Sequence, residues 1–253
     1  DDAERKILNV VKTRKGTEFR SIQDVLFKAQ SDLETLAQQK GDITGIATGF
    51  YDLDKLTSGL HPNELIIIAA RPGMGKTAFA LNLACNVAIN TDETVAVFNM
   101  EMGAEQLAMR MLSSLGQIDG NRIRTGRLEH NDWKRVNEAI SRLADTKMFI
   151  DDTPGMTIGE IRAKCRRLAS TNNGLGLIVI DYLQLISGSA KYAGNRQMEI
   201  SEISRSLKTL AMELEVPVIA LAQLSRSVEG RENKRPILSD LRDRKSTRLN
   251  SSH

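Results

Sequence analysis

One short segment of the chain combines residue types and a spacing that can hold a row of phosphate groups. Its residues are Ala70-Arg71-Pro72-Gly73-Met74-Gly75-Lys76-Thr77. The two glycines allow the backbone to curl closely, so that its N–H groups can point at phosphate oxygens. Lys76 can place a cation against the β- and γ-phosphates, and the hydroxyl of Thr77 can ligate Mg²⁺. The segment therefore predicts a binding site for a nucleoside triphosphate with magnesium.

The residues around this segment support the interpretation. The apolar run Leu65–Ala70 indicates a strand before it, and a helical pattern opens near Thr77. A P-loop requires a strand, a glycine-rich turn and a helix in that order, and the helix N-terminus adds its positive dipole end. Ala70 stands where the usual pattern has its first glycine, and we expect this small residue to be tolerated at a strand end. The residues expected to contact the nucleotide are Arg71, Pro72, Gly73, Met74, Gly75, Lys76, Thr77 and Ala78.

Two acidic residues and one amide follow other apolar runs and can complete such a site. Asp181 ends the run Leu177–Ile180, and ligands bind at the carboxyl ends of parallel strands. We expect Asp181 to hold the magnesium through water. Glu101 follows another apolar run, where it can act as a general base or simply be an acid favoured by a helix N-terminus. Gln223 can contact the γ-phosphate, or it can be an ordinary polar strand end.

After about residue 41, apolar runs of strand length alternate with helical patterns. The runs are Leu65–Ala70, Val95–Asn99, Met148–Ile150, Leu177–Ile180 and Val216–Leu221. The helical patterns lie near residues 77–90, 105–115, 132–144, 158–170 and 197–214. Strands that are apolar on both faces and alternate with helices predict an α/β fold with a mainly parallel sheet flanked by helices.

A separate amphipathic helix is predicted at Ser21–Ala37, ahead of this alternating region. Its apolar residues follow helical spacing, and Ser21 is a plausible N-cap with Asp24 three residues on. Residues 38–49 then break the pattern, so the helix is expected to stand on a tether. It can pack on its own domain or dock on a neighbour, and the pattern alone slightly favours the first.

Composition limits the class of protein. The chain has 253 residues, of which 41% are hydrophobic, so one large domain with a sizeable aliphatic core is expected. The sequence has neither a membrane-length apolar run nor a signal-peptide pattern, so we expect a cytoplasmic protein. Cys85 and Cys165 are far apart within helix-like stretches, so we expect buried thiols and not a disulfide. Residues 226–253 hold eight Lys/Arg against four Asp/Glu, which indicates either a polyanion partner or a solvated tail.

Several stretches together resemble the bacterial replicative helicases of the DnaB type, in their RecA-like C-terminal motor domain. The stretches are residues 70–77, Met100-Glu101-Met102, Ile180–Leu185, Gln223–Arg226, Lys234–Pro236, Ser239–Asp243 and Thr48–Asp54. The resemblance covers roughly residues 1–243 and is specific because the motifs occur in combination. It implies a RecA-like P-loop NTPase that forms a hexameric ring, hydrolyses ATP with Mg²⁺ between subunits, and moves along single-stranded DNA while unwinding duplex.

The resemblance also implies roles for particular residues. Lys76 and Thr77 are expected on phosphate and Mg²⁺, Asp181 on the metal, Glu101 as the base and Gln223 as a sensor of the γ-phosphate. Residues 21–37 are expected to dock on the adjacent subunit, which reverses the preference from the pattern alone. Other expectations concern DNA and protein partners: Arg242 and Asp243 on single-stranded DNA, a pore-facing loop at Gly188–Arg196, a primase and a helicase loader.

The resemblance divides the chain into four parts. Residues 1–20 are expected to be a remnant and linker from an N-terminal domain, residues 21–40 a linker helix, and residues 41–243 a RecA-like ATPase domain that is incomplete at its C-terminus. Residues 244–253 fit neither the family nor a core strand and are expected to be a non-native tail. In the family, the segment beyond residue 243 supplies an arginine finger, so the chain is expected to be weakly active or inactive alone. Gly103 stands where the family usually has serine, and glycine is an acceptable N-cap.

Other functions remain open at this point. A RecA-type recombinase or a clock-type ATPase shares the fold, the P-loop and the position of Glu101. A fragment that binds nucleotide and assembles without turnover is a third hypothesis. A small-molecule P-loop kinase is disfavoured, because the sequence has no acceptor-pocket signature and no arginine-rich lid.

Overall fold

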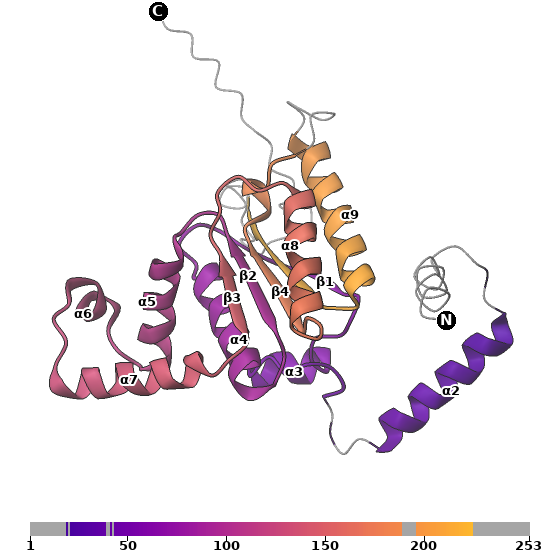
Figure 1. The fold of residues 1–253 in the computed structure, drawn as a ribbon, viewed down its shortest axis with the longest axis horizontal. Helices are drawn as coiled ribbons and strands as arrows, with labels where there is room; N and C mark the ends of the chain where they lie inside the picture. Colours follow the sequence, from indigo (N-terminus) through magenta and orange to yellow (C-terminus); the bar gives the residue numbers. More distant parts are fainter. Residues whose placement is uncertain (1–18, 20, 39–40, 42, 189–195, 225–253) are drawn as a thin grey trace, which may run out of the picture. The chain divides into compact units, whose positions relative to one another are not determined.

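The computed structural model describes residues 19, 21–38, 41, 43–188 and 196–224 of the chain. The chain separates into two compact units, Asp1–Thr44 and Gly45–His253, which are described one at a time. The second unit contains the sheet and the residues with predicted chemistry (Figure 1).

Five parallel strands form the sheet of the second unit, in the order β1-β5-β4-β2-β3. Their bounds are β1 Leu65–Ala70, β2 Val95–Asn99, β3 Met148–Asp151, β4 Leu177–Asp181 and β5 Val218–Gln223. Because every strand runs in the same direction, the carboxyl ends of all five lie at one edge of the sheet. The predicted α/β fold with a parallel sheet is confirmed.

Helices cover both faces of this sheet. Their bounds are α3 Tyr51–Thr57, α4 Lys76–Asn90, α5 Ala104–Leu115, α6 Gly120–Thr125, α7 His130–Ala144, α8 Ile158–Thr171 and α9 Arg196–Leu214, with a short 3₁₀ turn η1 at Leu183–Leu185. Alternate strand residues point to opposite faces. Ile178 and Ile180 of β4 therefore pack in one apolar layer with α8 and α9, whereas Leu177 and Val179 pack in another with α4 and α5. Figure 1 shows α8 and α9 on the near side of the sheet and α4 behind it.

The last predicted strand begins two residues later than expected. We predicted Val216–Leu221, and β5 is Val218–Gln223. The N–H of Val216 still bonds to the carbonyl of Ala211 in α9, because Glu215 takes a left-handed conformation with φ of 52°. Pro217 has no N–H to donate to a ladder. The pairing can therefore start only at Val218, whose N–H bonds to the carbonyl of Glu64.

The short helices α3 and α6 are not apparent from apolar periodicity. Each is stabilised by local polar contacts. The carboxylate of Asp54 accepts the N–H groups of Thr48 and Gly49 at 2.8 and 3.1 Å before α3. The carboxylate of Asp119 accepts those of Asn121 and Arg122 at 2.8 and 3.3 Å in α6.

The first unit contains one described helix, α2, which runs from Ile22 to Gln38. The predicted helix at residues 21–37 is confirmed to within one residue at each end, and the hydroxyl of Ser21 accepts the N–H of Asp24 at 3.1 Å, as expected of an N-cap. No side chain of α2 is buried, and Leu26 and Leu33 are 60% and 66% exposed. Among the described residues, none of the helices is apolar over a length that could cross a bilayer.

Candidate nucleotide-binding site

The glycine turn between β1 and α4 has the backbone that the sequence predicts. Gly73 and Gly75 have φ angles of 78° and 83°, in the left-handed region that favours glycine. A Cβ atom at either position would meet nothing within 4 Å, so backbone conformation rather than crowding requires the glycines. Gly75 is the N-cap of α4, and Lys76 is the first residue of that helix. The N-terminal amides of α4 therefore open at this turn, where an anion binds favourably.

A cavity of about 310 Å³ lies over the turn. Its lining contains most of the predicted nucleotide-contacting residues, namely Arg71, Pro72, Gly73, Gly75, Lys76, Thr77 and Ala78. Met74 does not line it, and its side chain is 64% exposed. Glu101 and Gln223 line the same cavity, although they lie 122 residues apart in sequence. The fold therefore brings together the P-loop, the predicted base and the predicted γ-phosphate sensor.

Asp181 lies beneath this cavity, in contact with the P-loop. The hydroxyl of Thr77 donates a hydrogen bond to Oδ2 of Asp181 at 2.6 Å, and Nζ of Lys76 lies 3.4 Å from Oδ1. Nζ of Lys76 also lies 4.3 Å from the ring centroid of Tyr182, within range of a cation–π contact. The carboxylate and the glycine turn are therefore at the same edge of the sheet, as a shared magnesium requires.

One oxygen of Asp181 has no hydrogen bond. The residue is 2% exposed, and Oδ1 is a buried atom that no hydrogen bond from the described residues reaches. Lys76 approaches it only at ion-pair distance. A buried polar atom without a hydrogen bond is uncommon in native structures, and one of the groups that can satisfy it is an ion. A carboxylate oxygen beside a threonine hydroxyl is a donor set that suits Mg²⁺, which binds few protein ligands and keeps waters and phosphate oxygens.

Asn99, at the end of β2, connects Asp181 to the turn that carries Glu101. Its Oδ1 accepts the N–H groups of Glu101 and Met102 at 3.0 and 2.8 Å. Its Nδ2 donates to Oδ2 of Asp181 at 3.3 Å, since Asn99 and Asp181 are register partners in the sheet. Sequence reasoning missed Asn99. The signal that could have found it is a polar residue at the tip of an otherwise apolar strand, two residues before the predicted base.

The N-terminus of α5, the helix after Glu101, is capped by a side chain from a distant segment of the chain. Gly103 supplies no side-chain cap, and Oδ2 of Asp152, just after β3, accepts the N–H of Ala104 at 2.9 Å. Arg110, two turns into α5, also lines the phosphate cavity. Neither contribution could be assigned from sequence, because Arg110 reaches the cavity, and Asp152 reaches the N-terminus of α5, only through the packing of α5 and β3.

A larger hollow of about 900 Å³ lies beside the phosphate cavity, with a lining drawn from α4, α5 and α6. Ala78, Met102 and Arg110 line both. The larger hollow has neither Lys76 nor Glu101 in its lining, so we assign the phosphate chemistry to the smaller cavity. The apolar contribution to its lining includes Leu81, Met102, Met109 and Ile123.

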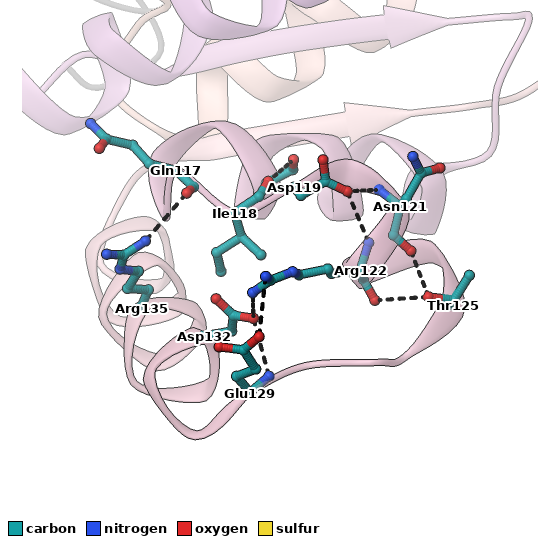
Figure 2. A network of polar contacts seen from close by, with 10 residues as sticks. Gln117, Ile118, Asp119, Asn121, Arg122, Thr125, Glu129, Asp132 and Arg135 are labelled. Carbon is teal, nitrogen blue, oxygen red and sulfur yellow. Dashed lines mark hydrogen bonds and ion pairs between the residues drawn. The ribbon is translucent and has the colours of Figure 1, made fainter.

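A polar network holds α6 against α7 next to this hollow (Figure 2). Arg122 of α6 forms ion pairs with Glu129 at 3.1 Å and with Asp132 at 3.0 Å. Asp132 also accepts the N–H of Glu129 at 3.1 Å, which completes a capping box at the start of α7. The backbone hydrogen bond from Glu129, followed by the hydrogen bond from Arg122, lowers the pKa of Asp132 below its usual value. The hydrogen bond to Asp132, followed by the negative charge of Glu129, raises the pKa of Arg122.

Neither cysteine takes part in the site. Cys85 and Cys165 are both free and buried, as the sequence predicts. Burial raises the pKa of each thiol to about 12, so both remain protonated at neutral pH. Among the described residues, no group of three His, Cys, Asp or Glu side chains could form a metal site.

The parallel sheet, the glycine turn and the acid facing it define a RecA-like P-loop nucleotide-binding domain. The model of the DnaB-like helicase C-terminal domain family matches residues 45–250, and the chain belongs to this family. This family membership, together with the sheet, confirms the resemblance seen in the sequence.

Curated relatives and solved structures agree with this assignment. The chain is 55% identical over 242 residues to the replicative DNA helicase DnaC of Bacillus subtilis (strain 168), covering 96% of the chain and 53% of that protein. It is 54% identical over 243 residues to the replicative DNA helicase DnaB of Geobacillus stearothermophilus, with the same coverage. The chain therefore spans about half the length of these relatives.

Two solved structures have the same fold. One is described as an ATPase domain and superposes with a TM-score of 0.82 at 40% identity, covering 89% of this chain and 78% of that one. The other, a DnaB-like replicative helicase described with its interactions with primase, superposes with a TM-score of 0.79 at 37% identity, covering 95% of this chain and 57% of that one.

Proposed function

We propose that this chain is the ATP-hydrolysing motor of a replicative DNA helicase, which couples hydrolysis to movement on single-stranded DNA and to duplex unwinding. The observation that carries the proposal is the contact of Asp181 with both Lys76 and Thr77 beneath a cavity lined by Glu101 and Gln223. Family membership favours this function over a recombinase or a clock-type ATPase. The high identity to two bacterial replicative helicases supports it, and a bacterial replicative helicase would work in the cytoplasm.

ATP and Mg²⁺ fit the residues of the site. Thr77 and Asp181 would hold the metal, because the threonine hydroxyl contacts Oδ2 of the Asp181 carboxylate while Oδ1 of the same carboxylate has no hydrogen bond. When bound, Mg²⁺ would neutralise the charge that develops on the phosphate oxygens. Lys76 would leave its ion pair with Asp181 to contact the β- and γ-phosphates. The N–H groups of the glycine turn would orient the phosphates from below.

Glu101 and Gln223 would act on the γ-phosphate side of the cavity. Glu101 would accept a proton from the attacking water, with its backbone held by Asn99. Gln223 would contact the γ-phosphate through its carboxamide. Arg110 would add a cation to the same cavity. The arginine finger stays a prediction from the resemblance.

The residues proposed to contact DNA lie in parts of the chain that the structure does not describe. Arg242 and Asp243, the segment 189–195, and the tail at 244–253 lie outside the described residues. We retain Arg242 and Asp243 as proposed contacts to single-stranded DNA. The helicase whose structure includes primase interactions supports a primase partner for the whole protein, and a helicase loader remains a proposal from the resemblance.

We also propose that α2 docks on a second copy of the chain within a homo-hexamer that shares its ATP sites between subunits. Its exposed apolar residues Ile22, Leu26 and Leu33 need a partner surface, and the hollow between α4, α5 and α6 offers apolar walls of matching character. Sedimentation of a Leu26→Asp, Leu33→Asp variant should show smaller assemblies than wild type. A Gln30→Asp, Glu34→Gln variant on the same helix is the matched control, and equal loss of assembly in both would contradict the docking face.

The function is tested by phosphate release with single-stranded DNA. Lys76→Ala should lower DNA-stimulated turnover by at least about a hundredfold, because it removes the cation that contacts the phosphates. Lys134→Ala, which removes an exposed lysine of α7, is the control and should leave turnover unchanged. Wild-type turnover in Lys76→Ala would contradict the proposal. The same assay on these 253 residues alone distinguishes a motor from an assembly fragment that binds nucleotide without turnover.

A further inference from the structure

We infer that Gln184 is a positioning residue for Gln223, and that it fixes the end of β5 where Gln223 lines the phosphate cavity. The inference rests on the proposed ATPase function. It concerns how the turn after Asp181 is connected to the predicted γ-phosphate sensor. Gln184 lies outside the strands, so its contact with Gln223 is not part of the backbone pairing of the sheet.

The starting observation is a gap in the sheet. The backbone pairing between β4 and β5 ends at Ile180 and Ala220, but β5 continues for three more residues to Gln223. On its other side, β5 stays paired with β1 as far as Ala70 and Gln223. Without another partner, the end of β5 would be held from one side only, at the place where its last side chain faces the cavity.

The side chain of Gln184 fills this gap. Its Nε2 donates to the carbonyl oxygen of Gln223 at 3.1 Å, and its Oε1 accepts the N–H of Gln223 at 3.2 Å. A primary carboxamide has one acceptor and two donors, so it can bond both polar groups of a backbone residue as a neighbouring strand does. Gln184 therefore extends the pairing on the β4 side of β5 beyond the point at which β4 itself ends.

Both ends of this connection are fixed. Gln184 lies in the 3₁₀ turn η1, between Leu183 and Ile186, which are 2% and 1% exposed and so anchor the turn in the core. On the far side, Leu224 donates its N–H to the carbonyl of Ala70, the residue before the glycine turn, at 3.1 Å. The end of β5 is thus held between the P-loop strand and the turn that follows Asp181.

This arrangement predicts which kinetic constant changes when the amide is lost. Lys76 and the glycine turn bind the phosphates without help from Gln184, so the KM for ATP should change little. The end of β5 would lose the two hydrogen bonds on one side, and Gln223 would face the cavity for a smaller fraction of the time. Loss of positioning in the transition state lowers kcat.

Gln184→Met tests this, because methionine has a similar length but makes neither hydrogen bond. We expect kcat for DNA-stimulated ATP hydrolysis to fall about tenfold, and KM to stay within about twofold. Gln184→Glu keeps the acceptor but places a carboxylate against the carbonyl of Gln223, so it should not restore kcat. Wild-type kcat in Gln184→Met would overturn the inference.

A double-mutant cycle separates positioning from general destabilisation. If Gln184 acts through Gln223, adding Gln184→Met to Gln223→Ala should change kcat by less than about twofold. Fully additive losses would overturn the inference. If Gln223→Ala alone keeps wild-type kcat, Gln184 has no sensor to position, and the inference fails together with the proposed role of Gln223.

Hydrogen exchange provides a readout that does not need turnover. The N–H of Gln223 should exchange about tenfold faster in Gln184→Met than in wild type, while the N–H of Ile219, in the middle of β5, keeps its protection. Unchanged exchange at Gln223 would overturn the inference even if the chain hydrolyses ATP. Faster exchange at Gln223 in a chain without ATPase activity would instead uphold the contact and reject the proposed function.

Discussion

Asp181 and Asp132 are both buried carboxylates, but the chain surrounds them differently. Asp132 is 5% exposed and accepts hydrogen bonds from Arg122 and from the N–H of Glu129. Asp181 is 2% exposed, and its Oδ1 is a buried atom without a hydrogen bond among the described residues. Asp132 has no side-chain atom that is both buried and without a hydrogen bond. Both are close to a cation, so proximity to a positive charge does not distinguish them.

The difference indicates what each cluster is for. Leaving a buried polar atom without a hydrogen bond destabilises a fold, and a functional role is one reason for a chain to keep such an atom. The Asp132 cluster is completed by the chain itself and stabilises the contact between α6 and α7. In the proposed function, Mg²⁺ with ATP would complete the Asp181 cluster.

The largest effect is expected for Glu101→Gln, which would separate chemistry from binding at the Asp181 cluster. The amide keeps the shape of the side chain but cannot accept a proton, so turnover should fall by about a hundredfold or more. The dissociation constant for an ATP analogue should stay close to wild type, because Glu101 is not assigned to phosphate binding. Single-turnover hydrolysis and fluorescence titration measure the two quantities, and unchanged turnover would remove Glu101 as the base.

A smaller effect is expected when Asn99 is changed. Asn99→Asp keeps the acceptor for the turn at Glu101 but places a second carboxylate against Asp181, so turnover should fall about tenfold. Asn99→Ser keeps an acceptor without adding charge and should lower turnover by less than about threefold. Steady-state phosphate release measures both. Equal turnover in the two variants would mean that a second carboxylate beside Asp181 does not affect turnover.

Asp132→Ala should do the reverse, lowering stability without affecting turnover. It removes the capping box and the partner of Arg122, so Tm should fall by about 2–6 °C at pH 7. Turnover per folded molecule should stay within about twofold of wild type. Differential scanning calorimetry and phosphate release test this. A large loss of turnover would show that the two clusters are not independent.

The pH dependence of the same variant gives a finer test. The pKa of Asp132 is lowered in the folded chain, so its carboxylate adds stability that is fully present above the unfolded pKa of about 4. That contribution is lost as the pH falls through the folded pKa. The difference in Tm between wild type and Asp132→Ala should therefore narrow from pH 5 to pH 3. A constant difference would mean that Asp132 contributes through packing and not through charge.

The smallest effect is expected for Asp152→Ala, which removes the cap of α5 but none of the groups that line the cavity. Tm should fall by about 1–3 °C, and turnover should fall by less than about threefold. Asp145→Ala, at the C-terminal end of α7, is a control because it removes an acid that caps no helix N-terminus. An equal fall in Tm for the two variants would contradict the role of Asp152 as the cap of α5.

The sequence predicted the parts of the site that depend on local chemistry. Gly73, Gly75, Lys76 and Thr77 were identifiable because backbone freedom and side-chain type act at the same place in the chain. Asp181 was predictable because a parallel strand delivers its last residue to the ligand edge. Met74 belongs to the same motif but does not line the cavity and is 64% exposed, so its place in the motif did not predict its contact.

The rest of the site depends on contacts between distant segments. Asn99, Gln184, Arg110 and Asp152 contribute through packing, and no spacing rule indicates which strand tip meets which turn. The exact bounds of the strands also could not be predicted from apolar periodicity alone. β5 begins at Val218 because of the local backbone at Glu215 and Pro217, which apolar periodicity does not record. The docking of α2 and the DNA contacts of Arg242 and Asp243 stay predictions.

The most direct test of the central claim is the effect of Mg²⁺ on nucleotide binding by Asp181→Asn. Calorimetric titration with a non-hydrolysable ATP analogue would be run with and without Mg²⁺ for wild type, Asp181→Asn and Asp132→Asn. Mg²⁺ should tighten binding by at least about tenfold, or about 1.4 kcal/mol, in wild type and in Asp132→Asn, but not in Asp181→Asn. An equal gain in Asp181→Asn would contradict the claim that the buried, unbonded oxygen of Asp181 is completed by the metal.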